Sequence, residues 1–311
     1  MTFKKKRVLV TGAGGFIGKH LCKALFKEDA TVVGLVRSEI DSKYLSEQYV
    51  VDISSEIYVR QIINEVKPEY VVHLASNKSR GDNPRTYSEA YRNNLIGSLN
   101  IINACQNNHM LLKFVTLGSS DEYGKLRVPF KETEKEAPIN AYGASKLAVT
   151  ELLKTLARSN GFSSVILRPS IVYGPGQDDS MFLPALIRAL VAGNSFDMSL
   201  GEQTRDFVYV DDLVQAIIQA LLAPSLCGDV INISSATPIR IDALAKMTAN
   251  ILGKGAEELL KFGAKDYRTS DVMQYWAANT LAKSLLGWSP TVSLEEGVQR
   301  TVDYFKAAAV K

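Results

Sequence analysis

The sequence has few cysteines and no long apolar run. Its three cysteines, Cys22, Cys105 and Cys227, are too few and too widely spaced for a disulfide framework or a zinc site. We therefore expect a reducing, cytoplasmic location and no bound metal. No apolar run reaches the roughly 18 residues that a membrane-spanning helix needs, so we also expect no membrane partner.

Excess charge of one sign is lacking as well. Lysine and arginine number 36 and aspartate and glutamate 33, which leaves a formal net charge of only +3 over 311 residues. Nucleic-acid-binding proteins usually carry a larger positive excess, so we expect no nucleic-acid partner. Because 46% of the residues are hydrophobic and 22% are charged, the composition is that of a globular protein and excludes a disordered chain.

Short apolar runs alternate with amphipathic segments of helix length over the first half of the chain. Such alternation requires crossover connections, and it predicts an α/β fold with a doubly wound parallel sheet of the Rossmann type. The predicted strands are Arg7–Val10, Thr31–Val36, Tyr49–Asp52, Tyr70–Leu74, Lys113–Leu117 and Ser164–Leu167. The predicted helices are Phe16–Phe26, Glu56–Val66, Thr86–Gln106 and Ala141–Ser159.

The alternation loosens after about residue 172, where glycine and proline interrupt the chain. We expect residues 1–173 to form a dinucleotide-binding domain, and residues 207–235 to return to it. Three runs in that second stretch would extend the first sheet and its helices: Phe207–Val210, Leu213–Leu222 and Val230–Ile233. The remaining segments, 174–206 and 236–311, are predicted to form a smaller α/β substrate-binding region.

A glycine-rich turn, Thr11–Gly18, follows the first predicted strand and opens the first predicted helix. Gly12 permits the tight turn, Gly15 lets a pyrophosphate approach, and Gly18 allows the helix to pack closely on the strand. The helix N-terminus also offers free amides to a phosphate. We therefore predict that this turn binds a dinucleotide, through Gly12, Gly15, Phe16, Ile17 and Gly18.

The end of the second predicted strand bears on the choice of cofactor. A carboxylate there would bind the adenine ribose of NAD and repel a 2′-phosphate, whereas this chain has Arg37, whose guanidinium attracts phosphate. We therefore expect NADP, with NAD possible; the alternative is that Arg37 is a solvated loop residue. Asp52, which ends the third predicted strand, could accept a hydrogen bond from the adenine amino group or cap the next helix.

A tyrosine and a lysine form the candidate catalytic pair. Tyr142 and Lys146 lie four residues apart on a predicted helix and therefore share one face. Ser119 and Ser120 follow the fifth predicted strand, at the carboxyl edge where open α/β sheets bind ligands. A phenol with a pKa near 10 is a poor acid or base at neutral pH, but an adjacent ammonium stabilises its phenolate.

Taken in order, these motifs resemble the extended short-chain dehydrogenase/reductase family, in its nucleotide-sugar epimerase/dehydratase/reductase branch. The resemblance spans nearly the whole chain. It rests on Thr11–Gly18, Asp52-Ile53, His73-Leu74-Ala75, Asn94–Gly97, Gly118–Gly124, Tyr142 with Lys146, Arg168–Gly176, Arg205–Asp212, Arg268 with Asp271, and Leu286–Pro290. It implies a homodimer and further cofactor contacts from Ile53, Leu74, Ala75 and Asn94.

The resemblance also implies roles at the substrate. Ser119 and Tyr142 would hydrogen-bond the reacting sugar oxygen, and Lys146 would also bind the nicotinamide ribose. The two arginines implied to grip the nucleotide diphosphate are Arg205 and Arg268, for each of which a surface ion pair is the alternative. Three further residues are expected to contact the substrate: Lys78, Ser120 and Ser170.

Three reactions share this set of residues: reduction of a keto sugar, epimerisation at C4, and 4,6-dehydration. Dehydration needs an additional carboxylate near Ser119, for which Asp121 and Glu122 are candidates, although the resembling dehydratases carry Glu where this chain has Asp121. The stretch 117–124 resembles most closely the reductases of nucleoside-diphosphate 4-keto-6-deoxyhexoses. We therefore favour an NADPH-dependent reductase with Tyr142 as proton donor. The alternatives are a 4,6-dehydratase, a 4-epimerase, or a non-enzymatic dinucleotide-sensing protein, against which the presence of Tyr142 and Lys146 argues.

Overall fold

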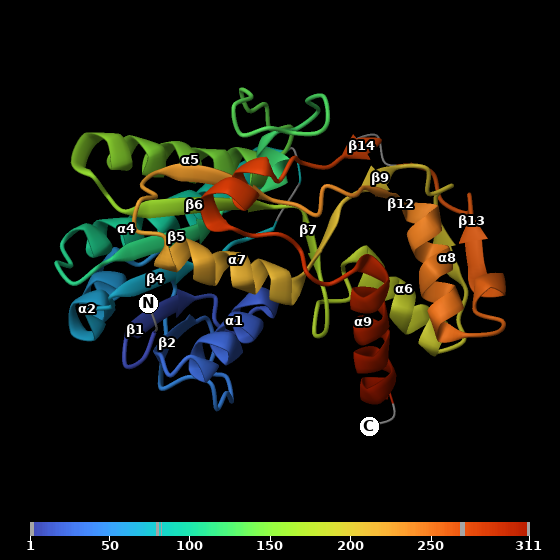
Figure 1. Ribbon diagram of the computed structural model, residues 1–311, viewed down its shortest axis with the longest axis horizontal. Helices are drawn as coiled ribbons and strands as arrows, with labels where there is room; N and C mark the ends of the chain where they lie inside the picture. Colours follow the sequence, from blue (N-terminus) through green and yellow to red (C-terminus); the bar gives the residue numbers. More distant parts are fainter. Residues whose placement is uncertain (1–2, 79–80, 82, 268–270, 310–311) are drawn as a thin grey trace.

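The computed structural model describes residues 3–78, 81, 83–267 and 271–309. Its centre is a seven-stranded parallel sheet with the order β3-β2-β1-β4-β5-β6-β11 (Figure 1). The strands are β1 (Arg7–Thr11), β2 (Thr31–Val36), β3 (Glu47–Val50), β4 (Tyr70–His73), β5 (Lys113–Leu117), β6 (Ser164–Pro169) and β11 (Asp229–Ile233). This architecture confirms the predicted α/β fold with a doubly wound parallel sheet.

Helices cover both faces of this sheet. One face carries α1 (Phe16–Lys27) and α7 (Val210–Leu222); the other carries α2 (Glu56–Val66), α4 (Gly97–Gln106) and α5 (Ala141–Asn160). Strand β1 shows why both faces are apolar: Val8 and Val10 pack in the cluster that contains α1 and α7, whereas Leu9 packs in the cluster beneath α2, α4 and α5.

The segment that the sequence predicts as one helix, Thr86–Gln106, is divided. It consists of α3 (Pro84–Ala90), a π-helical segment η1 (Tyr91–Ile96), and then α4. Asn83 caps the start of α3, because its side-chain oxygen accepts the Thr86 N–H at 3.0 Å. A π-helical insertion re-aims the side chains that it carries, and such insertions are frequent at functional sites.

The predicted extension of the sheet by Phe207–Val210 is wrong. Strand β10 (Phe207–Tyr209) pairs instead with β7 (Ile171–Tyr173), in a separate two-stranded sheet. The hydrogen bonds change partner just after β6: the Ser170 N–H donates to Ile233 O, but the Ile171 N–H donates to Asp206 O. The chain therefore leaves the large sheet at this point, while β11 joins that sheet as predicted.

The smaller region lies at the far end of the molecule and holds only short strands (Figure 1). Its strands are β8 (Phe196–Met198), β9 (Thr204–Arg205), β12 (Ile239–Arg240), β13 (Leu260–Phe262) and β14 (Gln274–Tyr275). Its helices are α6 (Phe182–Val191), α8 (Ile241–Leu252) and α9 (Leu294–Ala309). Within the described ranges, none of the helices combines the length and apolarity that crossing a bilayer requires.

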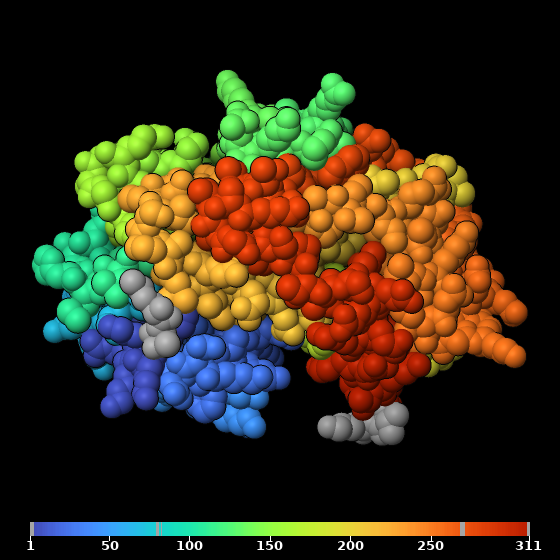
Figure 2. Space-filling view, in the orientation of Figure 1, coloured from blue at the N-terminus to red at the C-terminus, as the bar shows by residue number. Residues whose placement is uncertain are grey.

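One part of the predicted substrate-binding segment, 236–311, returns to the larger unit. The π-helical segment η4 (Ala282–Leu286) contacts α7 and β11, and Figure 2 shows this stretch lying across the surface of the molecule beside α7. Trp288 is buried there, and its indole N–H donates to Asp212 O at 2.8 Å. This stretch therefore packs against the sheet-bearing unit rather than among the short strands.

Candidate active site

The glycine-rich turn is closely packed. Gly12 has φ of +68°, and a Cβ there would lie 3.0 Å from the Ala75 backbone nitrogen; a Cβ at Gly18 would overlap Gly12 O. Helix α1 starts behind Gly15 with no side-chain cap and no acidic residue in its first turn. Its first amides are therefore open to an anion, and the turn fits the pyrophosphate of a dinucleotide. Phe16 and Ile17 form the first residues of this helix.

A buried histidine next to the glycine-rich turn links strand β4 to strand β1. His73 Nδ1 lies 2.7 Å from Thr11 Oγ1, and its Nε2 lies 2.8 Å from Ser98 Oγ. Burial, with a smaller contribution from the charge of Lys146, lowers the pKa of His73 to about 3, so the imidazole is neutral. Thr11 Oγ1 also accepts the N–H groups of the two residues predicted as cofactor contacts, Leu74 and Ala75, at 3.1 Å.

The end of the site beyond β2 carries exposed positive charge. Arg37 is exposed where β2 ends, and Asp52 is exposed where the loop after β3 turns. The Asp52 carboxylate accepts the Ser54 N–H at 2.9 Å, so it caps the turn. Hydrogen bonds from Ser54 lower the pKa of Asp52, and the charges of Arg92 and Arg37 contribute to this.

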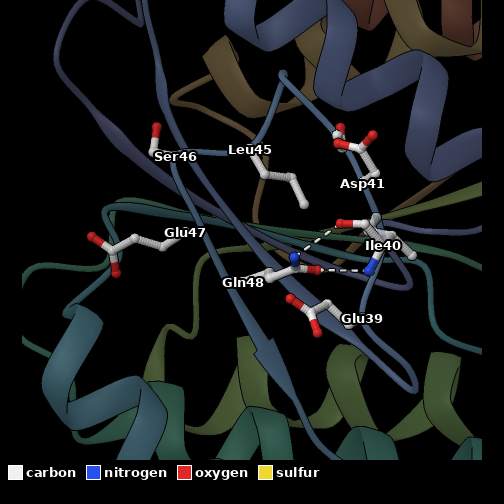
Figure 3. Close-up of a pocket in the computed structure, with 8 residues that line it drawn as sticks. Glu39, Ile40, Asp41, Leu45, Ser46, Glu47 and Gln48 are labelled. Atoms are coloured by element: carbon white, nitrogen blue, oxygen red, sulfur yellow. Dashed lines mark hydrogen bonds between the residues drawn. The ribbon is translucent and has the colours of Figure 1, made fainter.

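Two neighbouring features complete this end of the site. Ile53 packs against α4, since a Cβ at Gly97 would lie 2.7 Å from its Cδ1. The hollow in Figure 3 is lined by residues of the loop after β2 and of the start of β3, where Gln48 holds the backbone of Ile40 by two hydrogen bonds of 3.1 and 2.9 Å. Three carboxylates line this hollow, Glu39, Asp41 and Glu47, so it is unsuited to a phosphate group.

Asn94 is the polar centre of η1. Its Oδ1 accepts the Asn77 N–H at 2.7 Å and the Ser76 hydroxyl at 3.3 Å. Its Nδ2 donates to Asn77 O at 2.9 Å and to Ser145 Oγ at 2.8 Å. Asn94 is buried, and it therefore links the loop after β4 to helix α5, which carries the predicted catalytic pair.

Ser119 begins the short 3-10 helix η2 (Ser120–Glu122), directly after β5. Its Oγ accepts the Asp121 N–H at 3.1 Å, which leaves the hydroxyl proton available for donation to a substrate. Ser120 does not fit the predicted substrate contact: its side chain is buried and its hydroxyl donates to Pro169 O at 3.1 Å. Glu122 is also buried, so it cannot reach a sugar as the acid or base that dehydration requires.

Tyr142 and Lys146 lie at the start of α5, whose N-terminus Asn140 caps by accepting the Gly143 N–H at 2.8 Å. The Lys146 ammonium lies 5.9 Å from the centroid of the Tyr142 ring and donates to Leu117 O at 2.8 Å. A Cβ at Gly143 would lie 2.5 Å from the Asp121 backbone oxygen, so α5 packs directly against the Ser119 loop.

The electrostatic state of Lys146 depends on three effects. Burial lowers its pKa to about 8, the carboxylate of Glu122 opposes this shift, and the charge of Lys78 adds to it. At neutral pH the side chain is therefore charged but close to its titration range. An ammonium beside a phenol favours the phenolate, and this arrangement can pass a proton between Tyr142 and a substrate oxygen.

The smaller region brings Arg205 and Tyr275 to this loop. The Tyr275 hydroxyl donates to Asp121 Oδ1 at 2.8 Å, and the Arg205 guanidinium lies 5.8 Å from the centroid of the Tyr275 ring. Arg205 Nη1 donates to Val272 O at 2.7 Å, and Nη2 lies 3.9 Å from Asp271. Burial lowers the pKa of Arg205, and Asp271 opposes this.

The structure shows less about the remaining residues that are predicted to contact the substrate. Ser170 is buried, and its hydroxyl has no hydrogen-bond partner among the described residues. Lys78 is exposed in the loop after β4, and Arg268 lies outside the described residues. Sequence reasoning missed Tyr275, because it stands 154 residues from Asp121 and no local motif connects the two.

Comparison with known proteins relates the chain to nucleotide-sugar enzymes. The sequence model of the NAD dependent epimerase/dehydratase family matches residues 8–234. The chain is 30% identical to the UDP-glucuronate 4-epimerase of Thermodesulfobacterium geofontis, over 96% of the chain and 95% of that protein. The structure is similar to that of the UDP-glucose 4-epimerase of Thermotoga maritima with UDP-glucose, with a TM-score of 0.89, 32% identity, and coverage of 97% and 99%.

A second solved structure is also similar. It is the UDP-glucuronic acid 4-epimerase of Bacillus cereus in complex with UDP-glucuronic acid and NAD, with a TM-score of 0.87 and 29% identity. The match covers 97% of this chain and 99% of the other. All three relatives are therefore 4-epimerases of UDP-linked sugars, which supports the epimerase alternative better than the reductase that the sequence favoured.

Proposed function

Because the chain belongs to the NAD-dependent epimerase/dehydratase family, and is therefore an enzyme that uses an NAD(P) dinucleotide, we propose that it inverts C4 of a UDP-linked hexose or hexuronic acid. One observation carries the proposal: the Lys146 ammonium, 5.9 Å from the Tyr142 ring, is bonded to the last residue of β5, two positions before Ser119. A reactive phenol and a hydroxyl donor thus meet at the carboxyl edge of the sheet.

The chain's own residues would handle the proton. Tyr142 removes the proton from the C4 hydroxyl and later returns it to the same oxygen, and the Lys146 ammonium stabilises the phenolate between the two events. Ser119 donates its hydroxyl proton to that oxygen, since its Oγ is already accepting from Asp121 N–H. A bound nicotinamide dinucleotide supplies the reversible hydride acceptor when present.

Arg205 is proposed to bind the diphosphate of the substrate. Its Nη1 is engaged by backbone oxygens, which fixes the plane of the guanidinium, and its contact with Asp271 is long at 3.9 Å. The fork geometry of the remaining donors suits two phosphate oxygens. Tyr275, between Arg205 and Asp121, would then stand beside the sugar.

For the cofactor, we propose that NADP is accepted besides NAD. Arg37 occupies the position after β2, and the exposed positive charges of Arg37 and Arg92 both act on Asp52. A 2′-phosphate would be attracted to these side chains. The exposure of Arg37 limits the strength of this attraction, because solvent and salt screen it.

Arg37, rather than a carboxylate, stands directly after β2, and this favours a second candidate, an NADPH-dependent reductase of a nucleoside-diphosphate 4-keto-6-deoxyhexose. Such an enzyme would consume its cofactor in every turnover, whereas an epimerase would restore it. The homodimer implied by the resemblance stays a prediction.

The test separates the two candidates by product and by cofactor. Purified protein with NAD is incubated with UDP-glucose or UDP-glucuronic acid, and the C4 epimer is followed by NMR and chromatography. We expect the epimer to form with no net change in reduced cofactor, and Tyr142→Phe to abolish it. Net NADPH consumption with a 4-keto-6-deoxyhexose nucleotide, and no epimer from any UDP-sugar, would establish the reductase instead.

A further inference from the structure

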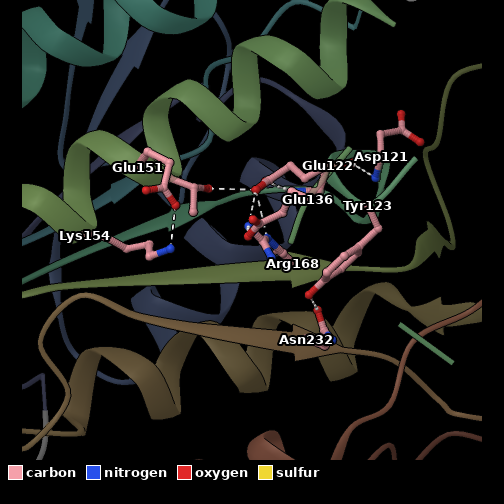
Figure 4. Close-up of polar contacts among 10 residues, drawn as sticks. Asp121, Glu122, Tyr123, Glu136, Glu151, Lys154, Arg168 and Asn232 are labelled. Atoms are coloured by element: carbon pink, nitrogen blue, oxygen red, sulfur yellow. Dashed lines mark hydrogen bonds and ion pairs between the residues drawn. The ribbon is translucent and has the colours of Figure 1, made fainter. Parts of the chain in front are cut away.

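A buried cluster of charges lies directly behind Ser119. Glu122 and Arg168 are both 0% exposed, and Arg168 donates to Glu122 Oε2 from Nε at 2.8 Å and from Nη2 at 2.6 Å. Arg168 Nη2 also lies 2.6 Å from Glu136 Oε1, and its guanidinium stacks 4.8 Å from the centroid of the Tyr123 ring. Figure 4 shows these side chains converging, while the Asp121 carboxylate points away from them.

The second oxygen of Glu122 holds the backbone of the catalytic loop. Glu122 Oε1 accepts the Ser119 N–H at 2.8 Å, and Oε2 also accepts the Thr150 hydroxyl at 2.9 Å. A Cβ at Gly118 would lie 2.5 Å from this Oε1, so only glycine leaves the carboxylate this close to the chain. The Ser119 N–H, the Thr150 hydroxyl and the Arg168 guanidinium all donate to this carboxylate, and these bonds favour its ionised form. Burial raises the pKa of Glu122, and the charge of Arg168 and the donated hydrogen bonds oppose that rise.

We propose that Glu122 is a positioning residue: held by Arg168 and Thr150, its carboxylate fixes the Ser119 backbone and thereby the direction in which the Ser119 hydroxyl faces the sugar. The proposal rests on the proposed function of Ser119. A buried ion pair commonly stabilises a fold no more than apolar side chains of the same volume would. The benefit of this pair is therefore geometric, since catalysis is sensitive to displacements of about 1 Å at the reacting groups.

Replacement of Glu122 by glutamine tests this positioning role directly. A carboxylate accepts on both oxygens, but an amide accepts on one side and donates on the other. In Glu122→Gln, the amide NH2 must therefore face either the Ser119 N–H or the Arg168 and Thr150 donors. The matched control is Glu136→Gln, because Glu136 also pairs with Arg168 and can keep this bond through the amide oxygen. Among the residues that the structure describes, the Glu136 side chain makes no hydrogen bond to the Ser119 loop.

The first measurement needs no substrate. Hydrogen exchange of a peptide that covers residues 118–123 is compared among wild type, Glu122→Gln and Glu136→Gln. We expect faster exchange in Glu122→Gln alone. If Glu122→Gln does not fold, Glu122→Asp serves instead, because it keeps the charge beside Arg168 but retracts the oxygen from Ser119. Unchanged exchange in the folded variant would overturn the proposal.

The second measurement is a double-mutant cycle with Ser119→Ala. We expect Glu122→Gln to lower kcat about 10- to 100-fold with little change in the KM of the UDP-sugar, and to cause no further loss once Ser119 is alanine. An equal loss in both backgrounds would indicate a merely structural role and would refute the proposal. Absence of turnover in the wild type would refute the proposed function, and the exchange result would still decide whether Glu122 holds Ser119.

Discussion

The two sides of the candidate active site are built in different ways. On the sheet side, Ser119 follows strand β5 and Lys146 lies on the long helix α5, and both are held by buried partners, among them Glu122. On the other side, Arg205 lies on β9, a strand of only two residues, and is held by backbone oxygens and by a long contact with Asp271. The difference teaches that the proposed reacting groups are fixed by the core of the fold, whereas the proposed contact of Arg205 with the substrate depends on short strands.

The largest effect is expected on the sheet side. Tyr142→Phe removes the hydroxyl that is proposed to exchange the proton and should lower kcat about 10²- to 10⁴-fold, the usual contribution of a positioned acid or base. Tyr142 is half-buried and the phenyl ring is retained, so the melting temperature and the binding of NAD should stay unchanged. The three quantities are measured by steady-state turnover, thermal unfolding and cofactor fluorescence titration. A variant with wild-type kcat would exclude the proposed role of Tyr142.

The second-largest effect is expected on the side of the site that is built from short strands and carries Arg205. Arg205→Leu should raise the KM of the UDP-sugar about 10- to 100-fold with a small change in kcat, because a hydrogen bond to a charged group is worth roughly 1.5–3 kcal/mol. Arg240→Leu is the matched control: Arg240 lies on the paired strand β12 and donates to the Asp242 carboxylate at 2.9 Å. In the described part of the chain, its side chain makes no hydrogen bond or ion pair with the Ser119 loop. If Arg205→Leu lowers kcat and leaves KM unchanged, Arg205 acts on the reaction and not on substrate binding, and the proposed difference between the two sides is wrong.

The sequence predicts the sheet side better than the other side, for physical reasons. The glycine turn and the spacing of Tyr142 and Lys146 are local patterns, because one turn and one helix determine how those residues face. The contact between Tyr275 and Asp121 depends instead on how two distant strands pack, and no spacing in the sequence encodes it.

The division of the predicted helix Thr86–Gln106 has a similar cause. The amide of Asn94 makes four hydrogen bonds, to Ser76, Asn77 and Ser145, and these accompany the π-helical turn. The apolar periodicity of the sequence does not reveal such a turn, because the hydrogen-bond partners of Asn94 come from other elements. The prediction for strand β10 is wrong for the same reason: Ile171 bonds to the backbone of Asp206, and the side chains of Ser234 and Ser235, in a later loop, donate to the Asp206 carboxylate.

A pH profile sharpens the comparison, because Lys146 belongs to the sheet side and burial lowers its pKa to about 8. The charged groups acting on Lys146 are Glu122, which raises its pKa, and Lys78, which lowers it, while neutral His73 lies nearby. The ammonium exists below its pKa of about 8, so the part of the kcat/KM profile that Lys146 governs should be level below that pH and fall roughly tenfold per pH unit above it.

The stability effect of Lys146 has the opposite sign and serves as an internal check. The pKa of Lys146 lies below its ordinary value of 10.5, so its charged form weakens the fold below about pH 8, and this penalty disappears as the pH rises from 8 towards 10.5. The alkaline loss of activity is therefore not caused by unfolding at this residue. The arginine of Lys146→Arg stays charged over the whole pH range. This variant should be less active than the wild type, but its kcat/KM should no longer fall at alkaline pH. If kcat/KM of this variant still falls at alkaline pH, a group other than Lys146 causes the fall.

The smallest effect is expected at Arg37, which belongs to neither side of the reacting centre. Arg37→Ser should raise the Kd of NADP about two- to fivefold and leave that of NAD unchanged, because exposed charge pairs contribute only about 0.2–1 kcal/mol. The effect should shrink at high salt, since screening weakens exposed charges. The control is Arg60→Ser, on the exposed face of α2, where Arg60 is paired with Glu56 at 3.9 Å. Equal changes in both dissociation constants would mean that Arg37 acts on the shared part of the dinucleotide, and the preference for NADP would then have to come from elsewhere in the loop after β2.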